Sequence, residues 1–402
     1  MALGRRVSLA LALALASCGA PPRPTPAPTV GAIIALQGRA DSGRELTRPR
    51  LLRGVDTNSA AEYFNRGARL VRFSIKLDTA EMYLYWASRL DPAWADPVFL
   101  RGIVILRALR KDAMDVLRST GSLRAVEQLD LPPGQVHRVD SLLHVAWGRN
   151  PFLFTDLDPP PFWGGSRDPS GAASFAFTMG RFAQAESLFA KALQKHPDNV
   201  LLRIYRSRAL FYLGRYNNAV AELEAARDTV RRSAEAHNSV VLPSVEMFEF
   251  AIGIARVQQD DFPAARVAFE RALTENLGFY WAHVRLAGSA LALHDTAAAL
   301  AELDAAVQLE GTDPVLRMYN GAILYGAGQR GEAAVQLERA IELDPHYAEP
   351  YYWLALVYRA QGRVPDAIHQ YQLFLAHAAR NDPKRAGVVQ DLKTLGPVPQ
   401  KQ

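Results

Sequence analysis

Apolar residues recur with helical spacing along most of the chain, and the pattern itself repeats. Ala185, Phe189 and Ala192 lie at positions i, i+4 and i+7, so they share one face of a helix. An equivalent alanine begins the same pattern at positions 185, 219, 265, 299, 333 and 367. Successive positions in this series differ by 34, 46, 34, 34 and 34. The regular step predicts a helical unit of about 34 residues, with one insertion of twelve.

Each unit is expected to contain two antiparallel helices. Glycine stands just before the repeated alanine segment in most units, as at Gly180 and Gly328, and its freedom of backbone conformation suits a tight turn. Proline ends the second helix at Pro197 and Pro345. A second apolar-periodic segment precedes each turn, so the sequence predicts a stack of helix pairs.

This arrangement resembles the tetratricopeptide repeat family, in which each repeat has two helices and the repeats stack into a right-handed superhelix. The resemblance covers residues 166–380 as six units and implies an all-α, right-handed superhelical solenoid. The second unit departs from it, because Arg203 and Arg206 stand where the family buries large apolar residues. We expect the first helix of that unit to be rotated or shifted by one residue.

The remainder of the chain is less regular. Residues 58–118 fit degenerate repeat-like helices, with Gly102 at a position where the family has a small residue. Residues 119–165 break the pattern, with an expected helix at 135–147 and then a loop rich in proline and aromatic residues. Residues 381–402 are expected to form a polar cap and tail.

The chain begins like an export signal. A basic pair, Arg5 and Arg6, precedes an apolar run of eleven residues, which is too short to cross a bilayer comfortably. Leu-Ala-Ser before Cys18 resembles the lipobox of bacterial lipoproteins, a family in which the leader, here residues 1–17, is removed and the cysteine is acylated. This resemblance implies a lipid anchor at Cys18; the alternative is an ordinary secretory leader with an incidental cysteine.

The residues after Cys18 bear on the location of the protein. In the lipoprotein family an aspartate directly after the cysteine favours the inner membrane, whereas this chain has Gly19 there. The resemblance therefore implies the outer membrane, facing the periplasm. Residues 18–57 combine a proline-rich tether, with five prolines in residues 21–28, and a segment without clear periodicity.

Composition excludes several classes of protein. Of the 402 residues, 49% are apolar and 22% charged, which excludes wholesale disorder, collagen and a polytopic membrane protein. One cysteine excludes an intrachain disulfide and argues against a structural zinc site. The 46 basic residues exceed the 41 acidic ones by too few to indicate a nucleic-acid partner.

Motifs for catalysis are weak. Gly326, Gly328 and Gly331 match the dinucleotide-binding pattern, but they fall between two helices rather than between a strand and a helix. His137 and His144 lie two helical turns apart, and we interpret them as part of a solvated face rather than as metal ligands. We expect no catalytic residues, no cofactor and no metal; the alternative is an enzyme with its site in residues 119–165.

The functional expectation is a lipid-anchored scaffold that binds partner proteins along the concave face. Some family members clamp a carboxylate with lysine and asparagine, but those positions hold Ile204, Arg208, Val284 and Gly288 here. An extended or helical peptide segment is therefore expected as ligand.

The alternative is a glycan- or peptidoglycan-binding module that uses Trp163, Trp281 and Trp353 as stacking platforms. The family's groove positions are aromatic residues, methionines and arginines, as is typical of binding hot spots, although several could instead belong to the core: Tyr205, Arg208, Tyr212, Met247, Phe250, Trp281, Arg285, Met318, Tyr319, Tyr325, Tyr352, Trp353 and Arg359.

Overall fold

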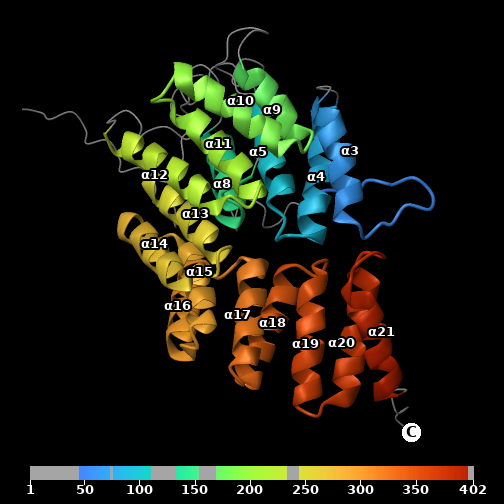
Figure 1. The fold of residues 1–402 in the computed structure, drawn as a ribbon. Coiled ribbons are helices and arrows are strands. Elements are labelled where there is room, and N and C mark those ends of the chain that lie inside the picture. Colours follow the sequence, from blue (N-terminus) through green and yellow to red (C-terminus); the bar gives the residue numbers. More distant parts are fainter. Residues whose placement is uncertain (1–44, 73–75, 110–132, 154–168, 233–243, 397–402) are drawn as a thin grey trace, which may run out of the picture.

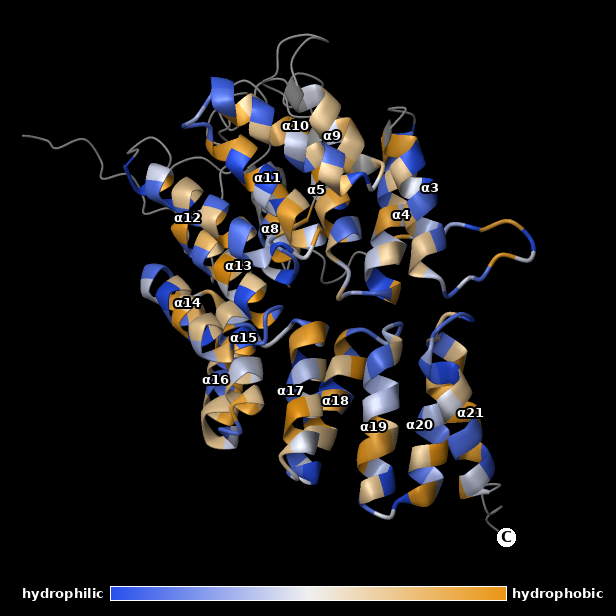
Figure 2. Cartoon of the chain, viewed as in Figure 1, coloured by the Kyte–Doolittle hydropathy of each residue, from blue (hydrophilic) through white to orange (hydrophobic). Residues whose placement is uncertain are grey.

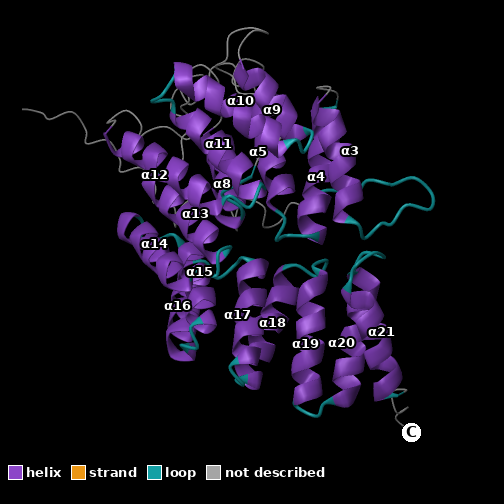
Figure 3. Ribbon diagram, in the orientation of Figure 1, coloured by secondary structure: helices purple, strands orange, loops and turns teal. Residues whose placement is uncertain are grey.

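The computed structural model describes residues 45–72, 76–109, 133–153, 169–232 and 244–396, and all regular secondary structure in these ranges is α-helical (Figure 3). The helices are α3 (Ala60–Arg72), α4 (Leu77–Leu90), α5 (Ala95–Leu109), α8 (Pro133–Arg149), α9 (Pro169–Thr178), α10 (Phe182–Lys195), α11 (Val200–Tyr212), α12 (Tyr216–Arg232), α13 (Val245–Val257), α14 (Phe262–Glu275), α15 (Tyr280–Ala292), α16 (Thr296–Leu309), α17 (Pro314–Gly326), α18 (Arg330–Leu343), α19 (Ala348–Ala360), α20 (Val364–His377) and α21 (Lys384–Leu395).

Consecutive helices pack as pairs, and successive pairs stack into an array (Figure 1). Within the described ranges there are eight pairs, from α3 with α4 to α19 with α20, and α21 covers the last pair. Each helix carries both apolar and polar residues (Figure 2), as expected for helices that bury one face and expose the other. The prediction of an all-α superhelical solenoid is confirmed. None of the described helices is long and apolar enough to cross a membrane.

The repeated alanines form the contact within and between pairs. All six alanines of the pattern have no exposed surface, and the large residue four positions later, such as Phe269 or Leu337, is equally buried. Gly253 in α13 and Gly321 in α17, each on the first helix of its pair, face these large residues. A Cβ atom on Gly253 would lie 2.3 Å from Phe269 Cε1, and one on Gly321 would lie 2.5 Å from Leu337 Cγ. A small residue is therefore required there for the helices to approach closely.

The same contact identifies an N-terminal pair that sequence analysis did not recognise. A Cβ atom on Gly102 of α5 would lie 3.2 Å from Leu143 Cδ2 of α8, and α5 packs along α8. Helix α8 falls in the stretch of residues 119–165 that was expected to break the repeat. It is in fact the second helix of a pair whose first helix is α5, and the pattern was hidden because residues 110–132 separate the two helices.

The second repeat unit keeps its register despite its two arginines. Ser207 lies twelve residues before Ala219, as Gly321 lies twelve before Ala333, and Ser207 is fully buried. The expected rotation or shift of α11 is therefore not observed. Arg206 instead reaches the carboxylates of Glu186 in α10, at 2.7 Å, and Glu222 in α12, at 2.6 Å. Ion pairs between three helices thus replace the apolar contact.

The turn inside each pair requires a left-handed backbone conformation. Gly328 adopts it with φ of 82°, and Gly180, Gly214 and Gly362 are similar. His294 stands at the position of the turn glycine and takes φ of 61°. A side chain with a Cβ atom is strained in this region, so His294 is a local weakness of the array.

The first helix pair contacts the last repeats, so the array curls back on itself (Figure 1). Arg89 at the end of α4 pairs with Asp344 at the end of α18, with 3.0 Å between Nη2 and Oδ1. The rings of Trp86 and His346 lie 4.8 Å apart in an edge-on arrangement. The backbone N–H of Arg380 donates to the Asp56 carboxylate at 2.6 Å.

Candidate partner-binding face

The end of α8 lies against the first helices of the central pairs. A Cβ atom on Gly148 would lie 2.3 Å from Trp281 Cδ1 in α15. Arg149 lies 3.5 Å from Asp313, the N-cap of α17, and Asp313 also accepts a hydrogen bond of 2.8 Å from the hydroxyl of the buried Tyr280. The end of α8 is therefore held by close packing, by charge and by a polar network.

The residues after α8 continue this contact. The ring of Phe152 stacks on Phe211 of α11, with 3.8 Å between ring centroids and 11° between planes. Phe152 is 1% exposed and belongs to the same apolar cluster as Ile204. Residues 148–152 thus cover the first helices from α11 to the start of α17, which is part of the face expected to bind a partner.

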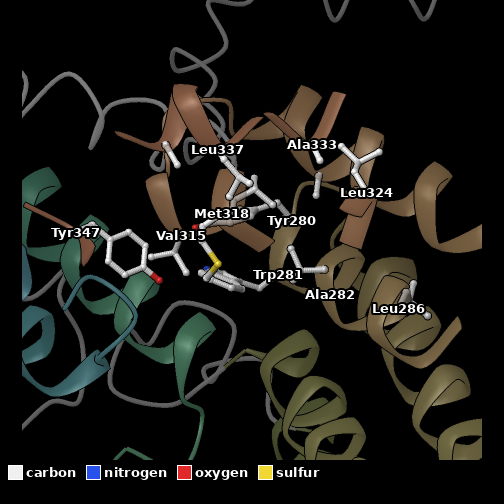
Figure 4. Packing of buried hydrophobic residues seen from close by; sticks show 14 of the residues in the cluster. Tyr280, Trp281, Ala282, Leu286, Val315, Met318, Leu324, Ala333, Leu337 and Tyr347 are labelled. Atoms are coloured by element: carbon white, nitrogen blue, oxygen red, sulfur yellow. The ribbon is translucent and has the colours of Figure 1, made fainter. Parts of the chain in front are cut away.

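Burial divides the thirteen predicted groove residues into two groups. Six of them are core residues, so the expectation that they line an accessible groove does not hold. Phe250, for example, packs against Phe269 and Phe279 with ring centroids 5.6 and 4.9 Å away. Trp281 and Met318 belong to one cluster, part of which Figure 4 shows. The six are Tyr205, Arg208, Met247, Phe250, Trp281 and Met318, each no more than 9% exposed.

The other seven predicted residues reach the surface. Six of them lie between α15 and the end of α19, and Tyr212 lies apart at the end of α11. We call the surface formed by α15, α17 and α19 the open face. The seven are Tyr212, Arg285, Tyr319, Tyr325, Tyr352, Trp353 and Arg359.

Three residues of the open face form a row. Arg285, Tyr319 and Trp353 come from three successive repeat units, and each is the sixth residue of its helix. Because the helices stack in register, the row runs along the array from a cation to two aromatic rings. Tyr325 adjoins it, with its ring centroid 6.4 Å from that of Trp353.

Arg285 differs electrostatically from Arg149 and Arg359, which lie on the same side of the molecule. Arg359 pairs with Asp391 at 3.1 Å, and Arg149 pairs with Asp313. In contrast, no group of the described residues forms an ion pair or hydrogen bond with the Arg285 guanidinium. The Nε atom of Arg285 is also buried. Burial lowers the pKa of Arg285, and the nearby Tyr319 partly offsets this. An unpaired, partly desolvated cation is unfavourable by itself and favours an anion that would neutralise it.

Groupings that would support other functions are not found in the described part of the chain. No three His, Cys, Asp or Glu residues there are arranged to hold a metal ion. His144 packs near the ring of Trp147, at 6.2 Å, and the His137 side chain is outside the described residues, as are Cys18 and Trp163. Trp281 is buried, so a glycan-stacking surface built on the three predicted tryptophans is not favoured.

Comparison with known proteins agrees with the fold. Two family models described as Tetratricopeptide repeat match residues 176–240 and 250–314, and one described as TPR repeat matches residues 321–362. The chain therefore contains tetratricopeptide repeats. Proteins of this class typically act as scaffolds for protein–protein interaction rather than as enzymes. A comparison with curated proteins gave no match.

Several solved structures are similar in fold. YrrB, described as a TPR protein with an unusual peptide-binding site, is 20% identical, covers 51% of this chain and 97% of its own, and has a TM-score of 0.38. A tetratricopeptide repeat protein from Parabacteroides merdae is 12% identical, with coverage of 84% and 98% and a TM-score of 0.41. The APC/C hetero-tetramer Cut9-Hcn1 gives 15% identity, coverage of 87% and 78%, and a TM-score of 0.45.

Sequence reasoning missed two features of this face. It did not place α8 against the repeats, although Gly148 at the end of an apolar-periodic segment was a signal for close helix approach. It also did not separate core from surface at neighbouring positions such as Met318 and Tyr319, where adjacent residues point about 100° apart on a helix.

Proposed function

We propose that this protein is a non-enzymatic scaffold that binds partner proteins on the open face and is held in a bacterial cell envelope by a lipid at Cys18. The observation that carries the binding part is the row of Arg285, Tyr319 and Trp353, because arginine, tyrosine and tryptophan dominate the energetics of protein interfaces. The row lies on helices whose backbone is fixed by buried packing, which lowers the entropy lost on binding.

The open face is the region of the predicted groove best suited to a partner. The end of α8 already covers Trp281, and helix packing buries Met247 and Phe250. A partner on the predicted groove is therefore expected to contact α15, α17 and α19. An extended or helical peptide segment fits an elongated surface of this kind.

Crosslinking in cells tests the binding part. Proteins captured by chemical crosslinking would be identified by mass spectrometry for the wild type, for a Tyr325→Ala and Trp353→Ala double variant, and for Val335→Ala. Val335 is 60% exposed on α18, away from the row, and serves as the matched control. We expect the wild type and Val335→Ala to capture the same proteins and the double variant to lose them. Equal capture by all three would contradict a role for the open face.

The anchor is proposed from the sequence before Cys18 and has its own test. Cys18→Ala removes the thiol that would be acylated. The variant should lose labelled palmitate and move from the membrane fraction to the soluble fraction after export. Unchanged labelling and fractionation would remove the anchor from the proposal and leave the binding part intact.

A further inference from the structure

We propose that the Arg285 guanidinium receives a glutamate or aspartate side chain of an extended peptide in the partner, while Tyr319 and Trp353 contact the apolar residues next to it. This inference rests on the scaffold function proposed above and names the chemistry of its ligand.

The unpaired charge is the first argument. Several other partly buried arginines in this array have carboxylate partners, such as Arg206 with Glu186 and Glu222. Arg285 has no hydrogen-bonding or ion-pair partner among the described residues, and its Nε atom is shielded from solvent. A carboxylate would supply charge-assisted hydrogen bonds that the folded protein itself does not provide.

Space for a ligand is the second argument. Trp281, Arg285 and Gly288 lie at i, i+4 and i+7 of α15, so they share one face of the helix. Gly148 of α8 closes this face at Trp281. One turn beyond Arg285 the face is open, because a Cβ atom on Gly288 would meet nothing within 4 Å. A peptide backbone can therefore approach α15 beside Arg285.

The aromatic row is the third argument, because it favours apolar residues beside the acidic one in the peptide. Tyr319 and Trp353 occupy the equivalent position in the next two first helices, and both are partly exposed. Their rings offer apolar area at low conformational cost. A single guanidinium beside two aromatic rings suits one carboxylate with apolar neighbours better than it suits a polyanion.

Fluorescence anisotropy with two labelled peptide pools tests this inference on the full chain. Both pools have degenerate leucine, tyrosine, serine and glycine positions, and they differ only in a central glutamate or glutamine. We expect the glutamate pool to bind the wild type about tenfold more tightly than the glutamine pool. Arg285→Met should abolish this preference, because it keeps an extended, unbranched side chain and removes the charge.

Arg339→Met is the matched control, since Arg339 is an exposed arginine of α18 that pairs with Glu342. It should keep the glutamate preference. Thermal unfolding separates binding from folding: Arg285→Met should melt at or above the temperature of the wild type, because it removes an unpaired cation. A lowered melting temperature would mean that Arg285 serves the fold and would overturn the inference, as would a glutamate preference that survives Arg285→Met.

The outcomes also separate this inference from the scaffold proposal. If proteins are captured through the open face while the two pools bind equally, the acidic ligand is wrong and the scaffold stands. If neither pool binds and no protein is captured through the open face, both fail.

Discussion

Gly148 of α8 and Trp281 of α15 are in such close contact that a methyl group on the glycine would lie 2.3 Å from Cδ1 of the indole. The chain thereby covers part of the face that was predicted from the sequence to bind a partner. Helices α15, α17 and α19 retain surface residues beyond this contact, and the charged and aromatic row lies there.

The first prediction concerns this contact. Gly148→Ala places a Cβ atom in the space of the Trp281 ring, so we expect it to lower the free energy of unfolding by about 1–3 kcal/mol, as overpacking does. Chemical denaturation followed by tryptophan fluorescence measures the change.

Gly387→Ala is the control for that experiment. Gly387 lies in α21, and a Cβ atom there would meet nothing within 4 Å. Alanine should stabilise this helix by about 1 kcal/mol because it has the higher helix propensity. If Gly148→Ala stabilised the protein as much as Gly387→Ala does, α8 would not be packed on Trp281 as described.

A second prediction concerns the strained turn between α15 and α16. His294→Gly should raise the free energy of unfolding by about 0.5–1 kcal/mol, because φ of 61° costs little for glycine. Gly328→Ala, at φ of 82° in the equivalent turn, should lower it by a similar amount. Denaturation midpoints of the two variants would be compared with that of the wild type, and changes of the same sign in both would refute the conformational explanation.

A third prediction rests on Asp344, which pairs with Arg89 across the junction of the first and last repeats. Burial raises the pKa of Asp344 from its ordinary 3.8 to about 7, even though Arg89 and the N–H of His346 act in the opposite direction. The folded protein then binds a proton more tightly than the unfolded chain does. The stabilising contribution of this group is present below about pH 4 and is lost as the pH rises to about 7.

Asp344→Asn isolates that effect from other groups at the junction. Burial lowers the pKa of His346, which gives the opposite slope in the same range, so the measured quantity is the stability of the wild type minus that of the variant. This difference should fall by a few kcal/mol, to order of magnitude, between about pH 4 and pH 7. A difference independent of pH would show that Asp344 is not desolvated at the junction.

The sequence was sufficient to predict the repeat core, because each repeat unit carries its own signal. Ala265 and Phe269 are buried as their spacing requires, and the same local periodicity predicted the helix at residues 135–147. The contact of that helix with α15 could not be predicted, because nothing in local periodicity says which distant surface covers Trp281. The Arg89–Asp344 pair depends on the curvature of the whole array, which accumulates over many small rotations between repeats.

The predicted binding residues were only partly informative for a related reason. Position in the repeat places Met318 and Tyr319 on the first helix of a pair, but a difference of one residue decides between core and surface. Met318 is 5% exposed, whereas Tyr319 is partly exposed. Equivalence between units is not a sufficient guide either. Tyr205 is the sixth residue of α11, as Tyr319 is of α17 and Trp353 of α19, but Tyr205 is buried whereas the other two are partly exposed.

The central claim, that partners bind on the open face, is tested most directly by placing a photoreactive phenylalanine analogue at single positions in cells. At Tyr325, beside Trp353, the account predicts crosslinks to a defined partner; at Val335, on the second helix of the same pair, it predicts none. Crosslinks to the same partner from Val335 with equal yield, or none from Tyr325, would contradict the account.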